Sequence, residues 1–71
     1  MEHLLAKTLL ITCVTELIAK KRSISLADAR DELYSSEIID FIDDDETGLY
    51  GESPLYVFSL FEKEKNKNNN I

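Results

Sequence analysis

Residues 2–21 read EHLLAKTLLITCVTELIAKK, with neither glycine nor proline to interrupt them. The stretch begins with an acid, Glu2, and leads into the basic run Lys20-Lys21-Arg22. An acid in the first turn and bases in the last turn both suit the dipole of a helix. The pattern therefore predicts one long helix over residues 2–21.

Apolar side chains cover more than half of the circumference of this predicted helix, whereas an ordinary surface helix needs a stripe of about 100°. One stripe consists of Ala6, Leu10, Cys13, Val14 and Leu17, and it is widened by Leu4, Ile11 and Ile18. The narrow polar face consists of Thr8, Thr12, Thr15 and Glu16. Such a helix is expected either at the centre of the domain or in contact with a second copy.

Serine residues mark the starts of two later helices. Ser25 is followed by Asp28, the spacing in which the serine oxygen accepts from a first-turn amide, and this predicts a helix over 26–34. Ser53 followed by proline is a strong helix start. It predicts a helix over 54–65 whose inward residues are Leu55, Val57, Phe58 and Phe61.

A short helix over 37–42 is expected between these two, after the break at Ser35-Ser36. The fold class predicted is all-α, a small bundle of three to four helices with a long central N-terminal helix. Residues 1–65 form a single helical domain, and the asparagine-rich residues 66–71 are expected to be a disordered polar tail.

The size and cysteine content of the chain point to oligomerisation. A core in 71 residues contributes little net stability, so small domains often add a disulfide, a metal or a second subunit. A single cysteine excludes an internal disulfide and a zinc site built on cysteine pairs. Association of identical chains into a homo-oligomer is the remaining way to stabilise the fold. No cofactor is expected.

Charge argues against a nucleic-acid partner. The chain carries 14 acids and 8 bases, a net charge of -6, so most of its surface repels phosphate. The predicted helix 37–42 offers Glu37 and Asp40 where a DNA-reading helix needs basic or amide side chains. An acidic face for a basic protein is expected instead.

The loop at 43–52 is the one stretch that resembles a metal site. Asp43, Asp45, Thr47 and Gly48 fall at the first, third, fifth and sixth positions of a calcium-binding EF-hand loop. Its twelfth position holds Pro54 and lacks the bidentate glutamate that completes the shell. A solvated acidic loop is the favoured interpretation, and weak cation binding through Asp43, Asp45 and Thr47 is the alternative.

No catalytic constellation is apparent, and an enzyme is not expected. His3 and Cys13, the only histidine and cysteine, are separated by ten residues of one helix, about 15 Å, too far for a nucleophilic pair. Cys13 is expected to be a small buried residue. The apolar run at 4–19 is too short and too polar to span a membrane, and a cytoplasmic location is expected.

A pattern of structural residues runs through the middle of the chain: SLADA at 25–29, Leu33, ETGLY at 46–50, Ser53, and Tyr56-Val57. In this pattern the chain resembles small, uncharacterised bacterial helical proteins that are grouped as a domain of unknown function. Some such proteins are encoded beside larger toxin-like partners, so the resemblance implies an antitoxin-like or accessory role as an alternative function. It assigns no functional residue.

The function expected from the sequence is a non-enzymatic protein–protein interaction module that self-associates through its first helix. The predicted interface consists of Leu10, Val14, Leu17, Ile18, Tyr50 and Tyr56.

Overall fold

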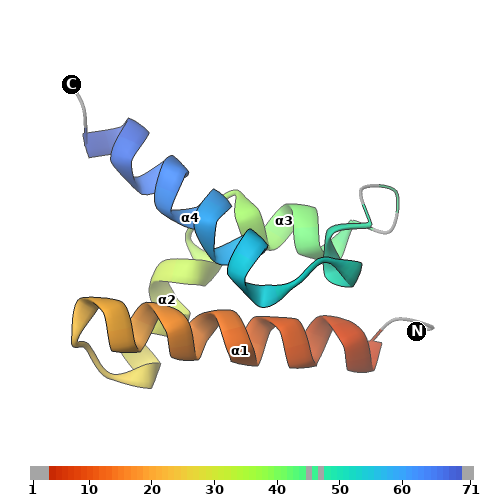
Figure 1. Cartoon of the computed structure of the whole chain (residues 1–71), viewed down its shortest axis with the longest axis horizontal. Helices are drawn as coiled ribbons and strands as arrows, with labels where there is room; N and C mark the ends of the chain where they lie inside the picture. Colours follow the sequence, from red (N-terminus) through yellow and green to blue (C-terminus); the bar gives the residue numbers. More distant parts are fainter. Residues whose placement is uncertain (1–3, 45, 47, 70–71) are drawn as a thin grey trace.

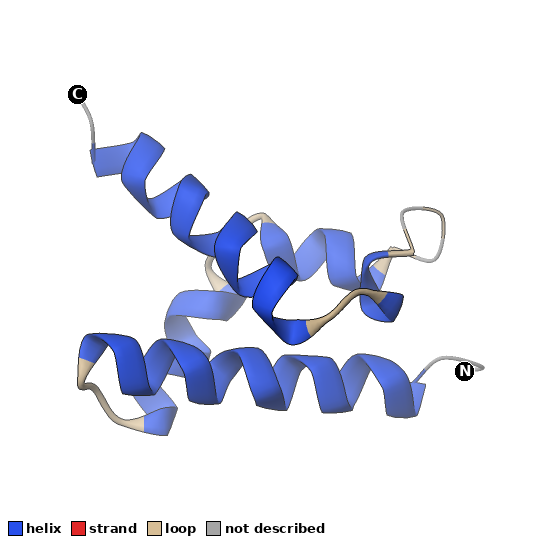
Figure 2. Ribbon diagram, in the orientation of Figure 1, coloured by secondary structure: helices blue, strands red, loops and turns tan. Residues whose placement is uncertain are grey.

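The computed structural model describes residues 4–44, 46 and 48–69. Its elements within these ranges are α1 (Leu4–Arg22), α2 (Leu26–Tyr34), α3 (Ile38–Asp43), the single 3-10 turn η1 (Leu49–Gly51) and α4 (Pro54–Asn69). No strand occurs in the described ranges (Figure 2). The predicted all-α bundle with a long first helix is confirmed.

Helix α1 runs along the length of the molecule, α3 and α4 lie above it in the view of Figure 1, and α2 crosses behind it. Helix α4 crosses α1 obliquely, so that its first half lies near α1 and its second half projects away. Helix α3 and the acidic loop that follows it lie toward the end where α1 begins. This arrangement lets one long helix contact α2, η1 and α4.

The core is formed by one face of α1 and the inner faces of the shorter elements. Each of its side chains is less than a tenth exposed: Leu10, Val14, Ile18, Ala29, Leu33, Ile38, Ile42, Leu49, Val57 and Phe61. All ten belong to a single cluster, to which every described helix contributes. A small chain thus closes one continuous core around α1.

Three residues of the predicted interface belong to this core. Leu10, Val14 and Ile18 are 4%, 0% and 0% exposed within the single chain. The face of α1 that carries them is the one that α2 and α4 cover, so a second copy cannot contact these side chains without opening the fold. They are corrected here from interface residues to core residues.

The helix starts follow the local sequence. The Ser25 hydroxyl accepts a hydrogen bond from the Asp28 amide at 3.0 Å, and the Ser53 hydroxyl accepts one from the Tyr56 amide at 3.2 Å. Both predicted serine caps are confirmed. Helix α4 differs from the prediction at its other end, since it continues through residues 66–69, which were expected to be disordered.

The turn after the acidic loop returns the chain to the core. Gly48 has φ +66°, the left-handed conformation that glycine adopts without steric cost. It is followed by η1, which places Leu49 in the core and leaves Tyr50 half-buried. Lys7 of α1 fixes this region, since its ammonium donates to the Asp43 carbonyl at 3.0 Å and lies 5.6 Å from the centroid of the Tyr50 ring.

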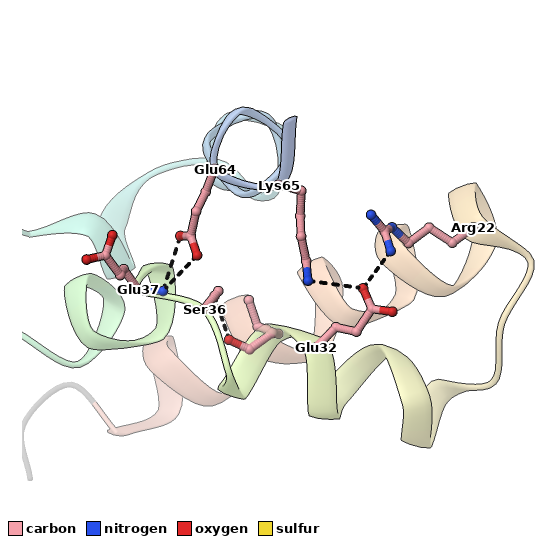
Figure 3. Close-up of polar contacts among 7 residues, drawn as sticks. Arg22, Glu32, Ser36, Glu37, Glu64 and Lys65 are labelled. Carbon is pink, nitrogen blue, oxygen red and sulfur yellow. Dashed lines mark hydrogen bonds and ion pairs between the residues drawn. The ribbon is translucent and has the colours of Figure 1, made fainter. Parts of the chain in front are cut away.

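Polar contacts tie the other ends of the helices together (Figure 3). Glu32 of α2 accepts from Arg22 of α1 at 2.7 Å, and the Lys65 ammonium of α4 lies 3.8 Å from the same carboxylate oxygen. Both oxygens of Glu64 accept from the backbone amide of Glu37, at 3.1 and 3.2 Å. Helix α3 therefore receives its N-terminal cap from α4 rather than from its own sequence.

Candidate docking groove between α1 and α4

The outer face of α1 is apolar where a solvent-exposed helix is usually polar. Leu5 and Leu9 are 72% and 56% exposed, and Cys13, one turn further along, is also exposed. These side chains are spaced by four residues, so they form one ridge along the helix. Cys13 had been expected in the core and is corrected here to this exposed ridge.

The ridge borders a groove at the start of α4. A hollow of about 500 Å³ is lined by Cys13, Glu16, Leu17, Lys20, Ser53, Pro54 and Leu55. A second hollow of about 210 Å³ is lined by Ala6, Leu9, Leu10, Cys13, Tyr50, Glu52 and Pro54. Because Cys13 and Pro54 line both, the two hollows adjoin each other. We call this surface the α1–α4 groove and define it by its apolar residues Ala6, Leu9, Cys13, Leu17, Pro54 and Leu55.

The geometry of α4 explains why the groove stays open. Val57 and Phe61 point into the core, and they anchor α4 against α1 on one side of the helix. Leu55 lies on a different side of α4 and is 69% exposed, although the sequence had predicted it to point inward. Its side chain forms the wall of the groove opposite Cys13 and Leu17.

The remaining predicted interface residues divide between the groove and other surfaces. Leu17 is half-buried and lines the larger hollow, and Tyr50 is half-buried and lines the smaller one. Tyr56 is 49% exposed and lines neither hollow. The sequence interpretation missed Leu5, Leu9 and Leu55, since an almost wholly apolar helix does not mark which of its sides faces the core.

The candidate cation site is only partly described. Asp45 and Thr47 lie outside the described residues, as does His3. The Asp43 side chain is exposed and has a carboxylate oxygen 3.8 Å from the Lys7 ammonium. Among the described residues, no group of three or more histidine, cysteine or acidic side chains is placed to hold a metal ion.

A membrane crossing needs about 20 predominantly apolar residues in one helix. No helix in the described part of the chain combines that length with sufficient hydropathy.

Comparisons with protein-family models, with curated proteins and with solved structures returned no match for this chain. The resemblance to small bacterial helical proteins therefore stays a prediction, and no residue role is transferred from a relative.

Proposed function

We propose that this protein is a non-enzymatic protein-interaction module in which a second copy docks on the exposed ridge of α1 and on the part of the α1–α4 groove beside Leu9. The observation that carries the proposal is the exposed ridge of Leu5, Leu9 and Cys13 beside the two adjoining hollows of the α1–α4 groove. Single exposed apolar residues are common on protein surfaces, but contiguous ones beside a groove are typical of interaction sites.

The spacing of the ridge favours a second copy as the occupant. Ridges of residues spaced by four pack into the grooves of an identical helix at a crossing angle of about −50°. In a two-fold arrangement centred on Leu9, the two Leu9 side chains meet at the axis and Leu5 of one copy lies against Cys13 of the other. The same surface then serves both copies, as a two-fold dimer requires.

This arrangement leaves the charged residues that border the larger hollow outside the contact. Glu16 and Lys20 border the larger hollow. Glu16 lies seven residues from Leu9, about 10 Å along the helix axis, where helices that cross at about −50° have already diverged. No charge is therefore desolvated at the centre of the proposed interface.

The cytoplasmic location expected from the sequence belongs to this proposal. An exposed thiol is prone to oxidation and to intermolecular disulfide formation in an oxidising compartment, whereas a reducing cytoplasm keeps it free. The association proposed here depends on apolar packing and not on that bond.

The test compares Leu9→Lys with Leu26→Lys in sedimentation velocity at high micromolar concentration, under reducing conditions. Leu26 is 52% exposed on α2 and does not line the groove, and both substitutions make the net charge less negative. Since less negative net charge favours association, loss of the dimer in Leu9→Lys and not in Leu26→Lys places Leu9 in the contact, where two lysines would replace apolar packing with like charge. We expect the wild type and Leu26→Lys to dimerise and Leu9→Lys to be monomeric with unchanged helix content by circular dichroism. A monomeric wild type would overturn the proposal.

A further inference from the structure

The threonine face of α1 forms a second, separate pocket with α2. Its volume is about 240 Å³, and its lining consists of Thr8, Ile11, Thr12, Thr15, Arg30 and Tyr34. The three threonines follow the helical spacing of α1, and Arg30 and Tyr34 are four residues apart on α2, so each set lies on one face of its helix. We call this site the threonine–arginine pocket.

The charge of this pocket is opposite to that of the molecule. No acid among the described residues lines it, although the chain carries a net charge of -6. The neighbouring bases are engaged elsewhere: Arg22 with Glu32, and Lys21 with Glu62. Within the described part of the chain, Arg30 makes neither an ion pair nor a side-chain hydrogen bond, so its guanidinium keeps its full donor capacity.

Thr15 supplies an independent sign of a missing partner. The residue is 3% exposed, and its hydroxyl is buried without a hydrogen-bond partner among the described residues. Buried polar atoms in native proteins nearly always have one, because leaving one unsatisfied costs about 1–3 kcal/mol. Thr15 lines the pocket and threonine populates two χ1 rotamers in helices, so we expect rotation to turn the hydroxyl toward a bound ligand.

We propose that the threonine–arginine pocket binds a carboxylate. The planar guanidinium of Arg30 matches the two oxygens of a carboxylate, and the threonine and tyrosine hydroxyls can donate to the remaining lone pairs. Ile11 and the ring of Tyr34 offer apolar contact to the carbon that bears the carboxylate. The pocket volume equals that of about eight water molecules, enough for a small organic acid or the C-terminal residue of a peptide.

A polyanion fits this site less well than a single carboxylate. One guanidinium offsets one negative charge, and the adjoining hollow, which shares Ile11 and Tyr34 with this pocket, contains Asp40 and Asp43. Those carboxylates repel a second negative charge on the same ligand. Inorganic phosphate is therefore expected to bind more weakly than a carboxylate of similar size.

The experiment is an NMR titration of the ¹⁵N-labelled full chain with N-acetylglycine, its neutral amide and inorganic phosphate. We expect saturable shifts at the amides of residues 8–15 and 30–34 with N-acetylglycine, and none with the amide. Parallel titrations with a glycine-rich peptide acid and its C-terminal amide separate the two sources of a carboxylate. Tighter binding of the peptide acid identifies a protein terminus, whereas equal binding identifies a free acid.

Two variants test the assigned residues. Arg30→Gln is expected to weaken N-acetylglycine binding by about tenfold, because a charge-assisted pair is lost. Arg22→Gln, which removes an equal charge outside the pocket, is expected to bind as the wild type does. Thr15→Val keeps the side-chain shape, and it is expected to weaken binding while the fold persists. Equal binding of the acid and its amide, unchanged affinity in Arg30→Gln, or a preference for phosphate would each overturn the proposal.

Discussion

At the scale of single residues, Gly48 is a glycine whose backbone conformation restricts the amino acid at its position. Its φ of +66° lies in the left-handed region, while Gly51, three residues later, is not in that region. At both positions an added Cβ would meet nothing within 4 Å. The two glycines therefore differ in backbone strain and not in the space around them.

Gly48→Ala is expected to lower the free energy of unfolding by about 1 kcal/mol, since alanine pays for the left-handed conformation that glycine adopts freely. Gly51→Ala is the matched control and should change stability by less than about 0.5 kcal/mol. Urea denaturation followed by circular dichroism measures both. An equal loss in the two variants would contradict the assignment of strain to Gly48.

At the scale of the helix, α1 carries two apolar faces with different roles. Ile18 is fully buried between the helices, whereas Leu9 is 56% exposed on the opposite side. Both are large aliphatic residues of one uninterrupted helix, so composition does not distinguish them. Their environments distinguish them. Substitutions at Ile18 and Leu9 therefore compare a buried and an exposed aliphatic side chain within one helix.

Ile18→Ala is expected to lower the free energy of unfolding by about 2–5 kcal/mol, the range for a cavity in a packed core. Leu9→Ala should cost less than about 1 kcal/mol, because an exposed side chain leaves no cavity. Thermal unfolding at low micromolar concentration measures the monomer and keeps association out of the comparison. A large loss for Leu9→Ala under these conditions would show that Leu9 belongs to the core.

The elements that the sequence predicted well depend on neighbours in the chain. Ser25, Ser53 and Pro54 act on amides within one turn, so their helix starts could be predicted from local spacing. The cap of α3 could not, because it comes from Glu64, which lies 27 residues from Glu37. The side of α1 that faces the core was likewise undetermined, since apolar residues surround most of the helix. Leu5 and Leu9 were missed for that reason, and Thr15 was assigned to a polar face although it is 3% exposed.

At the scale of the whole molecule, charge is distributed unevenly along the long axis. The bases at the end of α1 are paired with acids, Lys21 with Glu62 and Arg22 with Glu32. Exposed acids are found on α3 and in the segments on either side of η1 (Asp40, Asp44, Glu46 and Glu52), and α3 lies nearer the end of the molecule where α1 begins. Leu9 belongs to the half of α1 that begins at this end. Each copy carries a net charge of -6, so a dimer centred on Leu9 brings two chains of like charge together.

The dimer is expected to tighten as sodium chloride rises from low concentration, because salt screens this repulsion while the apolar contact remains. The Debye length falls from about 30 Å at 0.01 M ionic strength to about 8 Å at 0.15 M, so most of the effect should occur within that range. Sedimentation equilibrium across a salt series measures the dimer dissociation constant. The double variant Glu46→Gln/Glu52→Gln removes two of the acids and should dimerise more tightly at low salt, with a weaker salt dependence. A dimer that weakens with salt would mean that ion pairs hold it together, which contradicts an apolar interface centred on Leu9.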